Sequence, residues 1–186
     1  MTLDPVQVGS LTVLPVYDGV AVLTTEMFTH ANGSPTDWSD HTHLLDADGR
    51  LSVPVGGFVV RTGGDVVLVD AGAGVLTDDM FTCGLLLDSL RAIGVSAEDV
   101  TIVAITHLHT DHMGWLERDG QPVFPNATVR IGAADWTFFV DQAGSGRRKA
   151  ERLGAIADHV EPIDRDGAPI APGITSRATP GHTPGH

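Results

Sequence analysis

The chain has 186 residues, of which 42% are hydrophobic, and its 24 acidic and 11 basic residues give a net charge of −13. This length suits one domain with a sizeable core, and no apolar run reaches the roughly 20 residues that a membrane span needs. The missing apolar run predicts no membrane partner, and the negative charge, which opposes contact with phosphate backbones, predicts no nucleic-acid partner. The single cysteine and the lack of a basic leader at residues 1–5 predict a cytoplasmic protein.

The first third of the chain is predicted to be β structure. Short runs rich in β-branched residues predict strands at 11–16, 58–62 and 66–70. Gly63 and Gly64 lie between the last two runs and predict a hairpin there.

The polar stretch from 29 to 48 is interpreted as a long loop over a functional site. His41 and His43 have ligand-like spacing within it, and their role stays open, as does that of His30. Candidates for substrate contact are Phe28, His30, Trp38, His41 and Trp115. Ordinary packing or surface exposure explains each of these side chains as well.

After residue 70 the apolar pattern changes from the period of a strand to that of a helix. Apolar residues from Leu85 to Ile93 predict a helix that ends near Gly94. The remaining predicted elements are strands at 100–105, 127–131 and 174–178 and helices at 133–142 and 147–158. Strands mixed with helices in this order predict an α/β fold. No linker or repeat interrupts the sequence, so we expect one domain over residues 1–186.

The strongest feature is the segment Thr106-His107-Leu108-His109-Thr110-Asp111-His112, which directly follows an apolar strand. In an extended segment His107 and His109 point to the same side, so both imidazoles can face one ion. After a turn, Asp111 and His112 add a carboxylate and a third imidazole. Imidazole and carboxylate are typical zinc ligands, so this segment predicts a metal site. A polar surface loop with chance histidines is the simpler alternative.

A second histidine cluster is the segment Thr179-Pro180-Gly181-His182-Thr183-Pro184-Gly185-His186. Its glycines and prolines fix a tight backbone path, which suits a rigidly held ligand but suits any turn equally. Combined with the first cluster, His182 supplies the third imidazole of a tetrahedral metal site with one open position.

In these motifs the sequence resembles the metallo-β-lactamase superfamily. The resemblance rests on the turn Leu68-Val69-Asp70-Ala71-Gly72, on the signature from His107 to His112 and on the later histidine loop. Phe124-Pro125-Asn126-Ala127 and the repeated Thr-Pro-Gly-His are most similar to the subgroup of N-acyl-homoserine-lactone lactonases and methyl-parathion-hydrolase-like enzymes. The fold implied by the resemblance is an αβ/βα sandwich.

The resemblance also implies a set of metal ligands. It assigns His107, His109 and His182 to a first metal and Asp111 and His112 to a second. Two Zn²⁺ ions are the implied cofactor of a complete site, and manganese, iron and cobalt stay open as the native metal. Asp70 would orient the ligand loop, as carboxylates near metal-bound imidazoles do. His186 would be structural.

The implied activity is metal-dependent hydrolysis of a small molecule. A metal-bound hydroxide would attack the carbon or phosphorus of a lactone, ester or organophosphate, and Asp111 would act catalytically by passing a proton to the leaving group. Thioester hydrolysis of the glyoxalase II type, nucleic-acid processing and a non-catalytic metal-binding fragment are the alternatives.

Family members continue after the later histidine loop with a metal-bridging Asp and a final His, which cannot be assigned in this sequence. The resemblance therefore implies a chain truncated before the second half of the sandwich is complete. Half a sandwich would leave an apolar sheet face and strand edges exposed. We expect a fragment of a longer protein, with completion by a partner chain, as in a homodimer, as the alternative.

Overall fold

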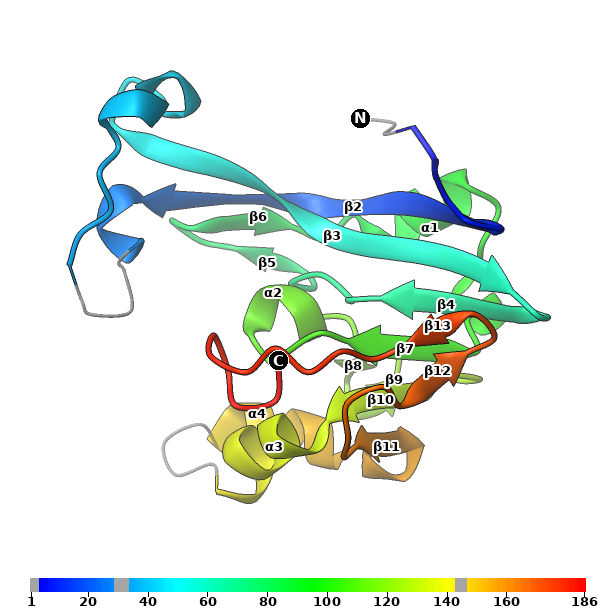
Figure 1. The fold of residues 1–186 in the computed structure, drawn as a ribbon. Coiled ribbons are helices and arrows are strands. Elements are labelled where there is room, and N and C mark those ends of the chain that lie inside the picture. Colours follow the sequence, from blue (N-terminus) through cyan, green and yellow to red (C-terminus); the bar gives the residue numbers. More distant parts are fainter. Residues whose placement is uncertain (1–3, 29–33, 143–146) are drawn as a thin grey trace.

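The computed structural model describes residues 4–28, 34–142 and 147–186 (Figure 1). Its strands are β1 (Val6–Val8), β2 (Leu11–Thr24), β3 (Arg50–Thr62), β4 (Asp65–Val69), β5 (Leu76–Thr77), β6 (Phe81–Cys83), β7 (Ile102–Ile105), β8 (Glu117–Arg118), β9 (Gln121–Pro122), β10 (Thr128–Gly132), β11 (Val160–Ile163), β12 (Pro169–Ala171) and β13 (Ile174–Thr175). Its α-helices are α1 (Leu86–Ala92), α2 (Thr110–Met113), α3 (Ala133–Trp136) and α4 (Arg147–Gly154). Short 3-10 helices lie at Thr25–Met27, Ser39–Leu44, Ala97–Asp99 and Ala157–His159, and a π-helical turn follows α3 at Thr137–Asp141. None of these helices is long and apolar enough to cross a membrane.

One large mixed sheet organises the fold. Its strands lie in the order β11-β10-β7-β4-β3-β2-β6-β5, and β1 pairs with β2. The four strands from β11 to β4 run parallel to one another, whereas β4, β3 and β2 form an antiparallel meander. The predicted α/β class is therefore confirmed.

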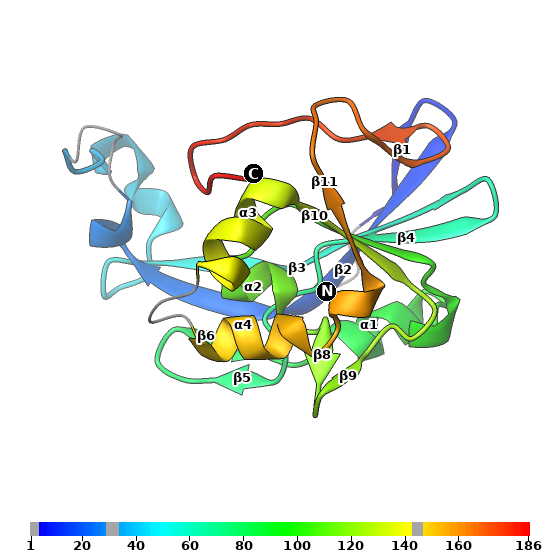
Figure 2. The ribbon, with the colours of Figure 1, turned by 90° about the horizontal axis from the view of Figure 1, so that it is seen from below.

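Helices α1 and α4 cover one face of this sheet, as Figure 2 shows. Leu86 and Leu90 recur on one face of α1 and are fully buried, together with Leu153 of α4, against sheet residues such as Val103 and Ile131. Each buried side chain of this size contributes about 1.5–3 kcal/mol relative to its exposed state. This main cluster forms the floor beneath the histidine-rich segment.

The opposite face carries a smaller apolar cluster. Val60 and Val67 of the central strands pack against Ile170 of the β12–β13 hairpin. The chain then crosses this face and returns to the end of the sheet near α2 and α3 (Figures 1 and 2). The C-terminal histidine loop thereby comes close to a segment more than 70 positions earlier in the sequence.

Most predicted elements are present, with different lengths. The strand predicted at 11–16 continues to Thr24, because β3 pairs with residues 13–24 across an irregularity at Tyr17/Gly19. The helix predicted at 133–142 is helical as far as Asp141, but only its first four residues, α3, are α-helical, and the rest form the π-helical turn. The strand predicted at 174–178 ends at Thr175.

Other expectations were wrong or incomplete. The long loop predicted at 29–48 contains a 3-10 helix at Ser39–Leu44, and residues 29–33 lie outside the described part of the chain. The helix predicted at 147–158 ends at Gly154 and is followed by the 3-10 helix at Ala157–His159. The edge strand β11, which begins at the next residue, was missed. A four-residue strand ending in Pro-Ile offers little alternation from which to recognise it.

Cys83 lies at the end of β6 in a small apolar cluster with Ala21 and Val55. Burial, reinforced by the nearby carboxylate of Asp18, raises the pKa of its thiol from 9.0 to about 11. At pH 8 the thiolate fraction is then about 100-fold smaller in the folded chain, and only the thiolate reacts with disulfide reagents. We therefore expect labelling by an aromatic disulfide to be at least about 100-fold slower in buffer than in guanidinium chloride. Equal rates would contradict the burial of this thiol.

Candidate metal centre

The histidine-rich site lies at the end of the parallel strands. Asp70 directly follows β4, Thr106 and His107 follow β7, and Asp135 lies three residues after β10. Because these strands are adjacent and parallel, their carboxyl ends meet at the same edge of the sheet, where ligand sites of open α/β sheets are usually found. The topology alone thus gathers polar residues from three distant segments.

Three imidazoles converge at this edge. One ring nitrogen from each of His107, His109 and His182 lies within 4.8 Å of the other two. His109 Nδ1 and His182 Nε2 are 3.0 Å apart, although the residues are 73 positions apart in the chain. The resemblance assigned these three side chains to one metal, and the structure brings them together.

His107 is the most buried member of this cluster, with 5% of its surface exposed. Its Nε2 is buried and has no hydrogen-bond partner within the described ranges. Burial, followed by the nearby imidazoles of His112 and His109, lowers its pKa to about 4. A neutral ring with a buried, unpaired nitrogen costs stability unless something binds it, and neutral imidazole is the form that coordinates divalent cations. The donor set therefore fits a metal ion.

Asp111 and His112 lie on α2, beside the three imidazoles. The ring centroids of His107 and His112 are 4.0 Å apart, and His112 Nε2 lies 3.3 Å from Asp111 Oδ2. Although burial opposes it, hydrogen bonds to Asp111 and Asp70 raise the pKa of His112 to about 9. The same pairing outweighs burial and holds the pKa of Asp111 below its ordinary value. Two further potential ligands thus face each other next to the first three.

Asp70 anchors this side of the site. Its Oδ2 lies 2.9 Å from His112 Nδ1, and its Oδ1 accepts a hydrogen bond of 2.8 Å from the backbone N–H of Thr106. The residue has a φ of 61°, a left-handed conformation that is uncommon outside glycine and clusters at functional sites. This conformation turns the carboxylate toward the end of β7. The contact agrees with the orienting role that the resemblance implied.

Asp135 was missed in the sequence because it was counted as part of a longer helix. It is fully buried on α3, where its carboxylate accepts hydrogen bonds from Leu108 N, Thr183 Oγ1 and Gly185 N. Its position in the sequence was the signal that could have revealed it. Asp135 comes just after β10, and β10 ends at the same edge of the sheet as β4 and β7.

Several candidate residues lie elsewhere. Trp115 is buried in the main core, and its Nε1 donates a hydrogen bond to Asp18. Phe28 and Trp38 pack edge to face, with His41 and His43 beyond them on the exposed 3-10 helix at the tip of β2 and β3 (Figure 1). His30 lies outside the described residues.

His186 lies beside the cluster rather than in it. Its ring centroid is 5.1 Å from that of His107, but its Nδ1 forms a 2.7 Å hydrogen bond with Thr179 Oγ1. This bond closes the C-terminal loop on itself, as expected for a structural role.

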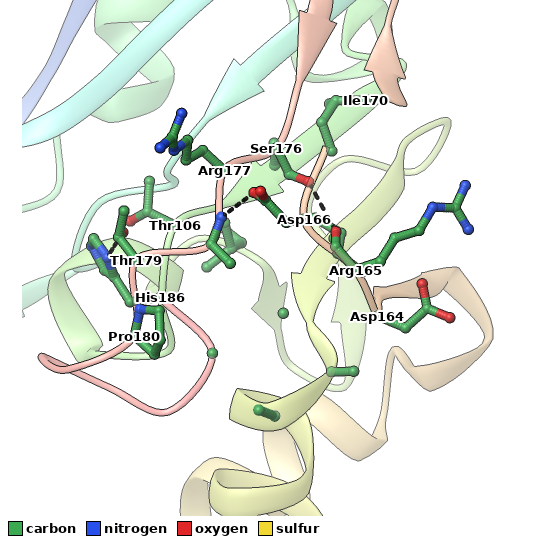
Figure 3. Close-up of a pocket in the computed structure, with 18 of the residues that line it drawn as sticks. Thr106, Asp164, Arg165, Asp166, Ile170, Ser176, Arg177, Thr179, Pro180 and His186 are labelled. Atoms are coloured by element: carbon green, nitrogen blue, oxygen red, sulfur yellow. Dashed lines mark hydrogen bonds between the residues drawn. The ribbon is translucent and has the colours of Figure 1, made fainter. Parts of the chain in front are cut away.

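A cavity of about 560 Å³ opens next to His186 and Thr106 (Figure 3). Its apolar wall includes Ile170 and Ile174, and Asp166 on its rim accepts a hydrogen bond of 2.9 Å from Ala178 N. The cavity thus adjoins the metal-binding edge on the face that carries β12 and β13.

Comparison with known proteins agrees with this arrangement. The family described as the metallo-beta-lactamase superfamily matches residues 55–186, which include all five potential ligands. The chain belongs to this superfamily. Its large mixed sheet with covering helices is the corresponding fold, as the resemblance implied.

Individual relatives extend over most of the chain. Metallo-beta-lactamase domain-containing protein 1 of Xenopus laevis is 31% identical over 157 residues, or 83% of this chain and 57% of that protein. The probable metallo-hydrolase YybB of Bacillus subtilis (strain 168) is 27% identical over 146 residues, or 76% of this chain and 59% of that protein. The chain therefore spans less than two thirds of the length of these relatives.

Among solved structures, AidC, a dizinc quorum-quenching lactonase in complex with its product, superimposes with a TM-score of 0.79 at 23% identity. The superposition covers 98% of this chain and 67% of AidC. At this identity the likeness shows a shared fold.

Proposed function

We propose that this chain is the metal-binding part of a metal-dependent hydrolase that acts on small molecules. The observation that carries the proposal is the convergence of three imidazole nitrogens within 4.8 Å, one of them a buried nitrogen without a partner among the described residues. Because the chain spans only part of the length of its relatives, the proposal concerns the complete protein as well as this chain.

In this proposal His107, His109 and His182 bind a first divalent cation, and Asp111 and His112 bind a second. Zn²⁺ is our first choice because histidine with a carboxylate is a typical zinc ligand set. Cations in such sites lower the pKa of water to about 7 and polarise the oxygen of a scissile bond.

The remaining chemistry falls to the side chains of this chain. Asp70 fixes the ring of His112 through the bond to its Nδ1, so that Nε2 faces the site. The Asp111 side chain keeps 37% of its surface exposed and can reach a bound substrate. It is placed to carry a proton to the leaving group.

We propose a lactone, an ester or an organophosphate triester as the substrate, with a lactone preferred. The repeated Thr-Pro-Gly-His motif, which resembles that of the lactonase subgroup, and the likeness in fold to a lactonase support this preference. The net charge of −13 also favours an uncharged substrate over an anionic one. If the protein cleaved a thioester faster than a lactone, thioester hydrolysis would replace lactone hydrolysis as the proposed activity.

The test is metal content and turnover on the purified chain. We expect about one tightly held metal per chain by elemental analysis, filling the three-histidine site, and hydrolysis of a chromogenic lactone that depends on added Zn²⁺. Two tightly held metals would mean that another residue or a second copy supplies further ligands. A chain that binds no divalent metal would contradict the proposal.

A further inference from the structure

We propose that Asp135 is a positioning residue that sets the distance between the two segments that carry the three metal-binding histidines. The inference rests on the proposed function. It adds a residue that, among the described residues, forms no hydrogen bond with any of the five proposed ligands but bonds to a neighbour of each histidine in the first site.

The contacts of Asp135 join the two segments directly. Its Oδ2 accepts a 2.9 Å hydrogen bond from the backbone N–H of Leu108, which lies between His107 and His109. The same oxygen accepts a 3.0 Å hydrogen bond from Thr183 Oγ1, next to His182. Its Oδ1 accepts a 2.6 Å bond from Gly185 N, further along the same loop. One buried carboxylate thus holds both segments, and the side chain is fully buried.

Glycines let the later loop lie directly against this carboxylate. A Cβ added at Gly185 would lie 2.5 Å from Asp135 N, and one added at Gly132 would lie 2.2 Å from Gly185 O. Both distances are too short for a real Cβ, so the loop packs backbone to backbone on the junction of β10 and α3. Such close packing leaves the loop little freedom once its hydrogen bonds to Asp135 are made.

Leu108 is held at both of its backbone polar groups. Its carbonyl oxygen accepts a 2.6 Å hydrogen bond from Lys149 Nζ of α4, while its side chain is fully buried in the core. The Lys149 bond to Leu108 therefore holds only the first histidine segment and does not hold the later loop. Asp135 bonds to the backbone N–H of the same residue and also to the later loop, so it couples the positions of His109 and His182.

Asparagine at this position keeps the shape but not the bonding. Its side chain offers one oxygen acceptor and one NH₂ donor group in place of two acceptor oxygens. With the oxygen toward Leu108 and Thr183, the NH₂ group faces Gly185 N–H; turned over, it faces Leu108 N–H. In both orientations a buried donor loses its acceptor, and one segment is pushed away from the other.

The experiment compares binding of Co²⁺ by the 186-residue chain and by Asp135→Asn, measured by competition with a chromophoric chelator and by the visible spectrum of the bound ion. We expect the affinity to fall about 10- to 100-fold, as it does when groups behind metal ligands are removed, and the absorption bands to change shape. The matched control is Glu117→Gln. Glu117 is also a buried carboxylate, and it accepts bonds from Arg152 and Gly120 N. In the described ranges its side chain forms no hydrogen bond with either histidine segment, so its variant should keep the affinity and the spectrum.

A second pair of variants decides the matter if Asp135→Asn does not fold. Thr183→Val removes the hydroxyl donor to Asp135, whereas Thr183→Ser keeps it, so the affinity should fall in the first and be largely retained in the second. Unchanged affinity and spectrum in Asp135→Asn, or equal affinities for Thr183→Val and Thr183→Ser, would overturn the inference while leaving the metal site intact. Absence of Co²⁺ binding by the unaltered chain would instead overturn the proposed function.

Discussion

Replacing His109 with alanine is expected to abolish metal-dependent turnover. The change leaves two of the three converging imidazoles, and it removes the Nδ1 that lies 3.0 Å from His182 Nε2. A metal ion supplies several kcal/mol of transition-state stabilisation, so its loss corresponds to a decrease in kcat/KM on the order of 1,000-fold. Metal content per chain should fall in parallel, which elemental analysis after dialysis would measure.

The matched control is His43→Ala, because His43 lies on the exposed 3-10 helix at the tip of β2 and β3. This variant also lacks one imidazole, but it should keep its metal and its activity. Full activity and normal metal content in His109→Ala would refute the assignment of this residue as a ligand. Loss of metal in both variants would point to a non-specific effect of removing histidine.

The histidine site was predictable where its chemistry is local. His107 and His109 follow an apolar strand with alternate spacing, so their rings had to lie on one side, and they do, with centroids 4.7 Å apart. Asp111 and His112 follow on the next turn. The addition of His182 needed a second motif, because nothing near the first cluster in the sequence points to a loop 73 positions away.

Two of the supporting carboxylates, unlike Asp70, were not predictable from a motif. Asp135 and Asp18 appear in the sequence as single acidic residues among apolar ones, without a repeated spacing. Their partners lie between 27 and 97 positions away, so only the folded chain reveals that each carboxylate is surrounded by donors. Secondary structure failed for a related reason. The length of β2 depends on pairing with β3, and Asp18-Gly19 within the strand has the composition of a turn, which hides the continuation of the strand to Thr24.

Asp18 is the second buried carboxylate that joins distant segments, and it supports the floor of the site. Its Oδ1 accepts hydrogen bonds from Trp115 Nε1 at 2.8 Å and from Leu86 N, at the start of α1, at 3.0 Å. Its Oδ2 accepts bonds from Ala73 N at 2.7 Å and Gly74 N at 3.2 Å, in the loop that follows Asp70. The side chain is fully buried, so none of these donors can turn to water instead.

The loop is shaped to fit this carboxylate. Gly72 has a φ of 52°, and a Cβ at this position would lie 2.4 Å from Asp18 Oδ2. Glycine is therefore required both by the left-handed backbone and by the close approach of the Asp18 side chain. The turn that begins at Asp70 thus has two contacts. The Asp70 carboxylate faces the histidines, and the backbone of the residues that follow surrounds the carboxylate of Asp18.

Asp18→Ala is expected to lower the free energy of unfolding by more than about 4 kcal/mol, which is enough to unfold many domains of this size. Each buried donor left without an acceptor costs about 1–3 kcal/mol, and the substitution strands the indole N–H of Trp115 together with several backbone N–H groups. Urea unfolding followed by circular dichroism would measure the change. The matched variant Asp79→Ala removes an exposed carboxylate in the same region and should alter stability by no more than about 0.5 kcal/mol. If Asp18→Ala were as stable as Asp79→Ala, the bonds to this carboxylate would not hold the loop, α1 and Trp115 together, and the geometry of the Asp70 turn would have to depend on strand pairing alone.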